Sequence, residues 1–427
     1  MKRKSLRIGY LWQYEGDGIL WQDYGSRECM ISATALHIGA VVGGFKRHGH
    51  RVRIVALRRN QPHWSKDLVH WQPTNHGVRT HRSFRILEKV LRGIQSRLHL
   101  PFLRLFDSYH FSDGCVSALN GFDILYERFF FLNYGGLITA RRLGIPLVLE
   151  VNGDLYEEFI QQGVPVSKIQ WAVIHWVTRF MFDRADYVVA VSETLKQRIV
   201  KRWQVDPSKI SVVNNGVDIE LFDNLDVYED VRSKYCLGDE QLIIFVGGFK
   251  PWHGIILLLE AFSIIAQTST VKAKLVLVGD GPMRLDCENK INELNIGERV
   301  IITGIVPHTD AAAFMSIADV NVLSHPNSPS AVAGSPMKLF EYMAAGRAIV
   351  APELPNLVSL LNHGENALLV PPNNAVALAG ALVELLENNT LRATLGKAAK
   401  QCAIEKHSWD QVVSELESIL YDLLEKP

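Results

Sequence analysis

Short apolar runs rich in β-branched residues alternate with helical patterns along most of the chain, and this alternation limits the possible folds more than any other feature. A run that is apolar at every position is typical of a parallel strand covered by helices on both faces. The repeated order strand, helix, strand therefore predicts α/β units with right-handed crossovers. The expected strands cover residues 6–11, 51–57, 123–128, 146–153, 187–192, 210–216, 242–248, 274–281, 299–306, 320–325, 348–352 and 367–372.

The chain is long enough for two domains, because 427 residues exceed what one ordinary hydrophobic core holds together. An acidic segment without a strand pattern interrupts the series between about residues 217 and 240. We therefore expect one doubly wound domain over residues 1–217 and a second over 218–407. Such sheets bind ligands at the carboxyl ends of their strands, so a central cleft is expected there.

Composition and charge exclude several classes of function. Lys and Arg together number 45, as do Asp and Glu, so no overall field attracts nucleic acid. No cysteine pair has C-x-x-C spacing, no Asp-x-Asp follows a strand, and the histidines are dispersed, so no metal site is expected. No run approaches the ~20 apolar residues that cross a bilayer, and we interpret the cysteines as reduced thiols of a cytoplasmic protein.

Two glycine-rich turns follow strands of the second half. The segment 246–254, VGGFKPWHG, runs through Gly248 into a helix, and its glycines allow the backbone to approach a ligand closely. Lys250 and His253 lie where they can face an anion. Gly281 belongs to a similar turn, VGDGP. Each turn alone also fits an ordinary connection between a strand and a helix.

A short helix is expected over about residues 336–345, with Ser335 as its N-cap and a proline at its first position. Lys338 then lies in the first turn, where a cation is unfavourable unless an anion such as a diphosphate binds there too. Glu341 shares the face of Lys338, one turn further along. A surface ion pair at this spacing is the alternative interpretation.

In this order the motifs resemble the donor domain of retaining GT-B glycosyltransferases, the glycosyl transferases group 1, which include sucrose synthase and phosphatidylinositol mannosyltransferase. The resemblance implies two Rossmann-like domains, with a last helix over about residues 408–427 that crosses back to the first. It also implies a nucleotide-sugar donor in the C-terminal domain. It rests on VGGFKPWHG, LVLVGDGP, VIITGIV, AGSPMKLFEYMAAGRAIVAP and ENALLVPP, and more weakly on AVVGGFKRHGHRVRIVAL, GIPLVLEVNGDLYEE, ADYVVAVSE and VVNNGVD.

The resemblance implies roles for individual residues. Glu341 would hydrogen-bond the ribose of the donor, and Lys338 would contact its diphosphate. With Lys250 and His253, Lys338 would stabilise the leaving nucleoside diphosphate without a metal ion. Asn215 belongs to a stretch expected to shape the domain junction. Donor-binding backbone is expected at Gly248, Gly281, Gly334 and Ser335.

Two positions depart from the family pattern. Ala333 stands where a glutamate usually binds the transferred sugar, and Asn152 stands where many members carry a histidine near that sugar. Asn152 can bond a sugar hydroxyl or be a plain turn residue. Because the phosphate and ribose positions are kept, we expect an active, retaining, metal-independent hexosyltransferase of polysaccharide or glycolipid synthesis. A non-catalytic nucleotide-sugar-binding partner, or an epimerase or hydrolase, is the alternative; a dehydrogenase is excluded because G-x-G-x-x-G is absent after the first strand.

The acceptor is expected in the first domain and is either a glycan or a lipid-linked molecule. The segment 78–106 carries seven Lys and Arg residues against one acid, opposite an apolar stripe at helical spacing. Such a helix suits peripheral contact with the inner face of a membrane, or it packs on the sheet with a solvated basic face. The segment 169–182, which contains Trp171, Trp176 and Phe180, is expected to be a core helix.

Overall fold

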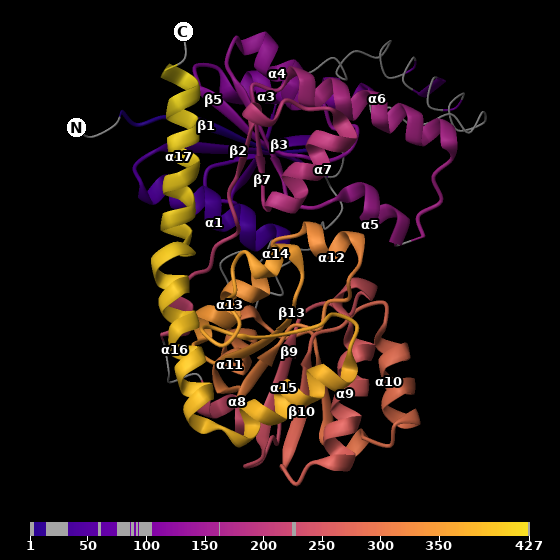
Figure 1. The fold of residues 1–427 in the computed structure, drawn as a ribbon. Coiled ribbons are helices and arrows are strands. Elements are labelled where there is room, and N and C mark those ends of the chain that lie inside the picture. Colours follow the sequence, from indigo (N-terminus) through magenta and orange to yellow (C-terminus); the bar gives the residue numbers. More distant parts are fainter. Residues whose placement is uncertain are drawn as a thin grey trace. The chain divides into compact units, whose positions relative to one another are not determined.

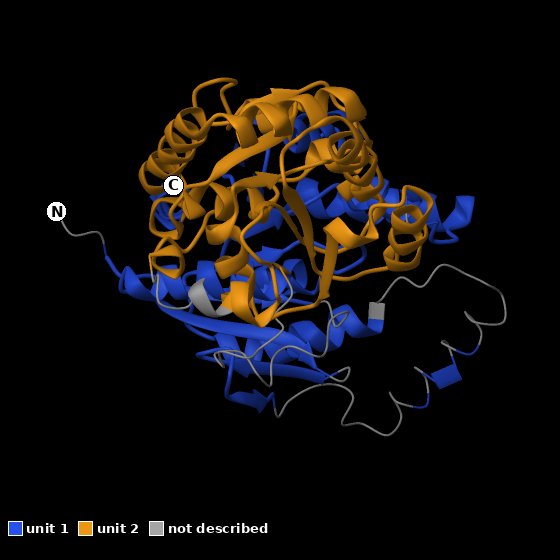
Figure 2. Cartoon of the chain, turned by 90° about the horizontal axis from the view of Figure 1, so that it is seen from below, with its two compact units in different colours: residues 1–25, 34–214, 413–427 blue, residues 26–33, 215–412 orange. Residues whose placement is uncertain are grey.

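The computed structural model contains two compact units, each built on one sheet (Figure 1, Figure 2). The first unit comprises the described residues of 1–25, 34–214 and 413–427, and the second those of 26–33 and 215–412. These divisions lie three to five residues from the domain limits expected from the sequence, 217 and 407. The structure describes residues 4–13, 33–58, 61–74, 86, 89–90, 93, 105–161, 163–223 and 228–425.

The sheet of the first unit has the order β4-β3-β2-β1-β5-β6-β7-β8. All neighbours from β2 to β8 are parallel, which confirms the prediction from the continuous apolar runs. The antiparallel strands β3 and β4 were not expected, because QPHWS and WQP carry prolines and polar residues in place of a strand pattern. The strands are β1 Arg7–Trp12, β2 Arg51–Arg58, β3 Gln61–Ser65, β4 Trp71–Pro73, β5 Ile124–Arg128, β6 Leu147–Val151, β7 Tyr187–Ala190 and β8 Ile210–Val212.

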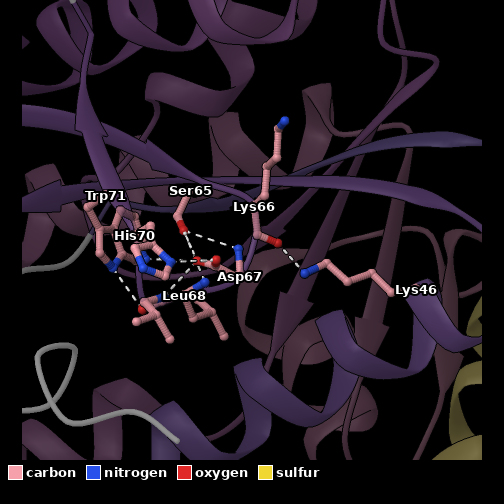
Figure 3. Close-up of polar contacts among 8 residues, drawn as sticks. Lys46, Ser65, Lys66, Asp67, Leu68, His70 and Trp71 are labelled. Atoms are coloured by element: carbon pink, nitrogen blue, oxygen red, sulfur yellow. Dashed lines mark hydrogen bonds and ion pairs between the residues drawn. The ribbon is translucent and has the colours of Figure 1, made fainter.

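The turn between β3 and β4 is held by side chains (Figure 3). Asp67 accepts hydrogen bonds from the backbone N–H groups of Val69 and His70, at 3.0 and 2.8 Å, and from the Ser65 hydroxyl. Partial burial alone would raise the pKa of Asp67, but these bonds and the His70 ring lower it. Lys46 donates to the Lys66 carbonyl in the same turn. The network explains how a polar sequence closes this sheet edge.

The last helix of the chain contributes to the first unit. From Val413 onward α17 belongs to this unit, and a Cβ at Gly44 of α1 would come within 2.4 Å of Val413 Cγ2. Glu417 of α17 bonds His48 at 2.9 Å and His50 at 2.7 Å. The helices are α1 Ala33–Arg47, α3 Leu105–Leu119, α4 Gly135–Leu143, α5 Leu155–Gln161, α6 Lys168–Arg184, α7 Glu193–Trp203 and α17 Trp409–Glu425.

The prediction that residues 169–182 form a core helix is only half correct. One face of α6 packs inward through buried Ile174, Val177 and Met181. Trp176, however, is exposed on the opposite face. The sequence is apolar on both sides of this helix, so its composition alone does not tell which side meets the sheet.

The second unit has a fully parallel sheet in the order β11-β10-β9-β12-β13-β14. Leu242 and Ile244 enter one apolar core, while Ile243 and Phe245 enter the other, which explains why β9 is apolar at every position. Its strands are β9 Gln241–Val246, β10 Ala273–Val278, β11 Val300–Gly304, β12 Val320–Val322, β13 Ala348–Pro352 and β14 Leu368–Val370. Its helices are α8 Tyr228–Lys234, α9 Ile255–Thr268, α10 Arg284–Glu293, α11 His308–Ile317, α12 Pro329–Ala333, α13 Met337–Ala345, α14 Pro355–Val358, α15 Ala375–Glu387 and α16 Asn389–Lys406.

Two further expectations concern membranes. Within the described ranges, every helix is too short or too polar to cross a bilayer. Most of the basic segment 78–106 lies outside the described residues, so its interpretation as a membrane-contacting helix stays a prediction.

Candidate functional site

In the candidate site of the second unit, three turns that follow strands are joined by backbone hydrogen bonds. Gly247 N–H donates to the Val278 carbonyl at 2.9 Å, and Gly279 N–H donates to the Gly304 carbonyl at 3.0 Å. A Cβ at Gly281 would come within 2.6 Å of the Phe249 nitrogen. A glycine is therefore required at this position because two backbone segments pass close to each other. A Cβ at Gly248 would meet nothing nearer than 3.8 Å.

Lys338 is the central cation of the site. It lies in the first turn of α13, and its Nζ passes beside Gly247, where a Cβ would come within 2.5 Å of it. The nitrogen lies 4.4 Å from the centroid of the Phe245 ring, and it is buried with no hydrogen-bond partner in the described part of the chain. Burial lowers the pKa of Lys338 to about 7, and the nearby Glu341 only partly opposes this shift. A buried ammonium without an acceptor is costly, so the arrangement favours an incoming anion.

His253 and His325 stand beside this lysine. Their rings meet edge to face with centroids 5.3 Å apart, and His253 Nδ1 bonds the Gly248 carbonyl. Since a carbonyl only accepts, Nδ1 carries the proton and Nε2 keeps a free lone pair. Burial and the charge of Lys338 lower the pKa of His253 strongly and that of His325 to about 3. Both rings are therefore neutral, and the positive charge expected from His253 is not supplied in this state.

Glu341 has a partner that the sequence did not suggest. Its Oε1 lies 2.8 Å from Nε2 of His308, the first residue of α11. Burial would lower the pKa of His308, but the hydrogen bond and charge of Glu341, with the charge of Asp218, raise it overall. His308 lies a few residues after β11, a position at the carboxyl edge of the sheet that could have singled it out.

The loop before α13 differs from the prediction. Pro336, and not Ser335, is the N-cap, and no side chain caps the helix. The Ser335 hydroxyl instead accepts from Asn215 N–H at 3.2 Å, while Asn215 Nδ2 donates to the Ser335 carbonyl at 2.6 Å. Asn356 Nδ2 holds the Gly334 carbonyl at 2.8 Å. With these carbonyls fixed, the N–H groups at the start of α13 keep no side-chain cap and can face a ligand.

The remaining predicted positions are distributed as follows. Ala333, where the family pattern has a glutamate, ends α12 and is fully buried. A Cβ at Gly334 would meet nothing within 4 Å. Lys250 is exposed, with its Nζ 5.2 Å from the centroid of the Trp252 ring. Among the described residues, no cluster of His, Cys, Asp or Glu could hold a metal ion.

Asn152 lies in the first unit and lines a cavity of about 190 Å³. Its Nδ2 is buried and has no hydrogen-bond partner among the described residues. Arg128 lines the same cavity, with its Nη1 3.2 Å from His37 Nδ1 and 3.9 Å from Glu150 Oε2. Glu150 also accepts from the Tyr126 hydroxyl at 2.7 Å. Sequence analysis did not identify this network. Its residues on β5 and β6 lie within strands that were interpreted only as apolar runs.

Comparisons with known proteins cover almost the whole chain. Residues 228–402 match the family model described as glycosyl transferases group 1, and residues 34–221 match glycosyltransferase family 4. An uncharacterized glycosyltransferase of Methanocaldococcus jannaschii is 24% identical over 390 residues, 90% of this chain and 93% of that protein. The sucrose-phosphate synthase of Thermosynechococcus elongatus has a similar fold, with a TM-score of 0.70, 20% identity and 99% and 100% of the two chains covered. The Anabaena protein HepE in complex with UDP-glucose gives a TM-score of 0.67 at 17% identity, over 98% and 100%.

Proposed function

Because the chain belongs to the group 1 glycosyltransferases and has their GT-B fold of two Rossmann-like domains, we propose that it transfers a hexosyl group from a nucleotide sugar with retention and without a metal ion. The observation that supports this most is the buried Lys338 ammonium, which has no hydrogen-bond acceptor among the described residues and lies at a helix N-terminus without a side-chain cap. That arrangement suits a donor diphosphate.

In this proposal the chain's own groups stabilise the leaving nucleoside diphosphate. Lys338 and the first N–H groups of α13 bind the phosphates, and the open backbone at Gly248 borders them. Anion binding returns the pKa of Lys338 towards its ordinary value, so the lysine is cationic when negative charge develops. The Nε2 lone pair of His253 accepts a hydrogen bond from a sugar hydroxyl, and exposed Lys250 adds long-range positive charge.

Glu341 would bind the ribose hydroxyls. Its carboxylate is already oriented by His308 at 2.8 Å, and no hydrogen bond among the described residues occupies its second oxygen. With Ala333 buried in place of a glutamate, the transferred sugar is held by other groups. Asn152 and Arg128 offer N–H donors from the first unit, where we place the hydroxyl acceptor, a glycan or a lipid-linked molecule. Polysaccharide or glycolipid synthesis at the inner face of a membrane, reached through segment 78–106, remains a prediction.

The experiment is turnover of UDP-, GDP- and ADP-sugars by the purified full-length protein, with EDTA present throughout. UDP-glucose is the first donor to test, because HepE was crystallised with it. Slow release of nucleoside diphosphate from one donor, lost in Lys338→Met but kept in the surface control Lys397→Met, supports the proposal. Release only after a divalent ion is restored would refute metal independence.

The second candidate function is a non-catalytic nucleotide-sugar-binding partner, and the absence of a carboxylate at Ala333 favours it. Donor binding without any release, in the presence of a panel of sugar and lipid-phosphate acceptors, would support this candidate. Release of product in which the anomeric configuration is retained, observed by NMR, would exclude it.

A further inference from the structure

The outer face of α6 carries an apolar stripe that the proposed reaction does not use. Ile169 is 64% exposed and Trp176 is 68% exposed, although α6 lies within a packed domain. Phe180 lies one turn beyond Trp176, and the two rings stack with centroids 6.2 Å apart and an angle of 15°. At ~100° per residue, Ile169, Trp176 and Phe180 lie within about 40° of one another around the helix.

Two more exposed apolar residues lie in the chain before the helix. Ile160, at the end of α5, and Val164, in the following loop, are exposed as well. Four of the thirteen large apolar side chains that are exposed among the described residues therefore fall between residues 160 and 176. Single exposed apolar residues need no explanation, but the exposed apolar residues on one face of α6 form a patch of the kind that marks a contact surface.

Cations flank the stripe on both sides. Lys168 and Arg179 are exposed on one side, and the Arg184 guanidinium on the other lies 5.6 Å from the centroid of the Phe180 ring. Asp183 is the single acid of α6, and it pairs loosely with Arg179 at 3.8 Å. Aromatic and aliphatic side chains between cations match the boundary between headgroups and acyl chains of an anionic bilayer.

We propose that this face of α6, centred on Ile169 and Trp176, lies on an anionic lipid surface. A second copy of the chain fits less well, because a two-fold contact brings the same patch of each copy together. Each patch carries three cations and one acid, so the two patches would repel each other. A lipid surface supplies both the apolar layer and the opposite charge. The proposal is independent of segment 78–106 and of the donor site.

The test is cosedimentation of the full-length protein with vesicles of phosphatidylcholine alone or with about 30% phosphatidylglycerol. The double variant Ile169→Gln/Trp176→Gln should lower the partition coefficient onto anionic vesicles about tenfold. The matched control is Leu285→Gln/Val376→Gln, which removes two apolar side chains of similar exposure, 66% and 71%, from the second unit, and it should bind as the parent does. Circular dichroism and thermal melting confirm that each variant folds.

Four outcomes would overturn the proposal. The parent protein could fail to prefer anionic vesicles over neutral ones. Both double variants could lose binding equally, in which case the loss is not specific to α6. The α6 variant could bind as the parent does, in which case any membrane contact runs through another segment such as 78–106. Finally, the α6 variant could abolish self-association in sedimentation velocity while leaving vesicle binding unchanged, which would identify a second copy as the occupant. Donor turnover does not enter the test, so its failure leaves the proposed reaction untouched.

Discussion

Two cations, Lys338 in the second unit with a buried Nζ and the partly buried Arg128 in the first, lie in different electrostatic surroundings. Arg128 lies 3.2 Å from the neutral His37 ring and 3.9 Å from the Glu150 carboxylate, which compensates its charge. Within the described part of the chain Lys338 has no hydrogen-bond acceptor, and Glu341, whose charge acts on it, is bonded to His308. A compensated cation suits recognition of neutral hydroxyls, whereas an uncompensated one suits a ligand that brings negative charge.

The largest effect is expected from Lys338→Met. Loss of the cation should lower kcat/KM for the preferred donor by about 10²–10³, because it removes charge stabilisation of the leaving diphosphate. The same change should leave thermal stability unchanged or raise it, since it removes a buried charge that has no hydrogen-bond partner among the described residues. Steady-state kinetics and thermal melts check both parts, and a variant that melts much lower than the parent would break the comparison.

Arg128→Met should behave in the opposite way. It leaves the buried Glu150 without its cation, so the free energy of unfolding should fall by about 3 kcal/mol. Urea denaturation measures this value, and nucleotide binding to the second unit should not change. If Arg128→Met were as stable as the parent, Glu150 would not be the compensating group.

Glu341→Gln should raise KM for the donor about tenfold, with a smaller effect on kcat, because the amide keeps one acceptor for the ribose and loses the charge. The control is His308→Asn, which keeps a donor near Glu341 and should have a weaker effect. If Glu341→Gln raised KM equally for ribose and 2′-deoxyribose donors, the result would argue against a contact between Glu341 and the ribose.

Stability should also depend on pH through Lys338. Its pKa of about 7 in the folded chain lies below the ordinary 10.5, so the unfolded chain binds more protons between these values. The free energy of unfolding should therefore rise with pH over this window relative to Lys338→Met. Bound UDP should flatten the rise by keeping Lys338 protonated. Melting curves from pH 6 to about 9.5 test this, and an identical slope in both proteins would contradict it.

The smallest effect on stability is expected from Gly334→Ala, because a Cβ there meets nothing within 4 Å. The change should be below about 0.5 kcal/mol. The contrast is Gly281→Ala, whose Cβ would come within 2.6 Å of the Phe249 nitrogen and should destabilise the unit by about 1–3 kcal/mol. A loss of turnover in Gly334→Ala with intact stability would report contact with the donor.

Sequence reasoning was most successful where local pattern decides structure. The continuous apolar runs predicted the parallel strands, since residues such as Ile243 and Ile244 must be buried on opposite faces. It failed where residues far apart in the sequence determine the local structure. Ser335 does not cap α13, because its hydroxyl accepts a hydrogen bond from Asn215, 120 positions away. His308 and Asn356 were missed for the same reason, and α6 because both its faces are apolar.

The most direct test of the central claim is calorimetric titration of UDP, in EDTA, into the parent protein, Lys338→Met and the surface control Lys397→Met. If Lys338 meets the donor diphosphate, the parent and the control bind alike, with proton uptake near pH 8, and Lys338→Met binds at least about tenfold more weakly without proton uptake. Equal binding by all three proteins, with the parent taking up no proton, would contradict the assignment of Lys338 as the cation that meets the donor diphosphate.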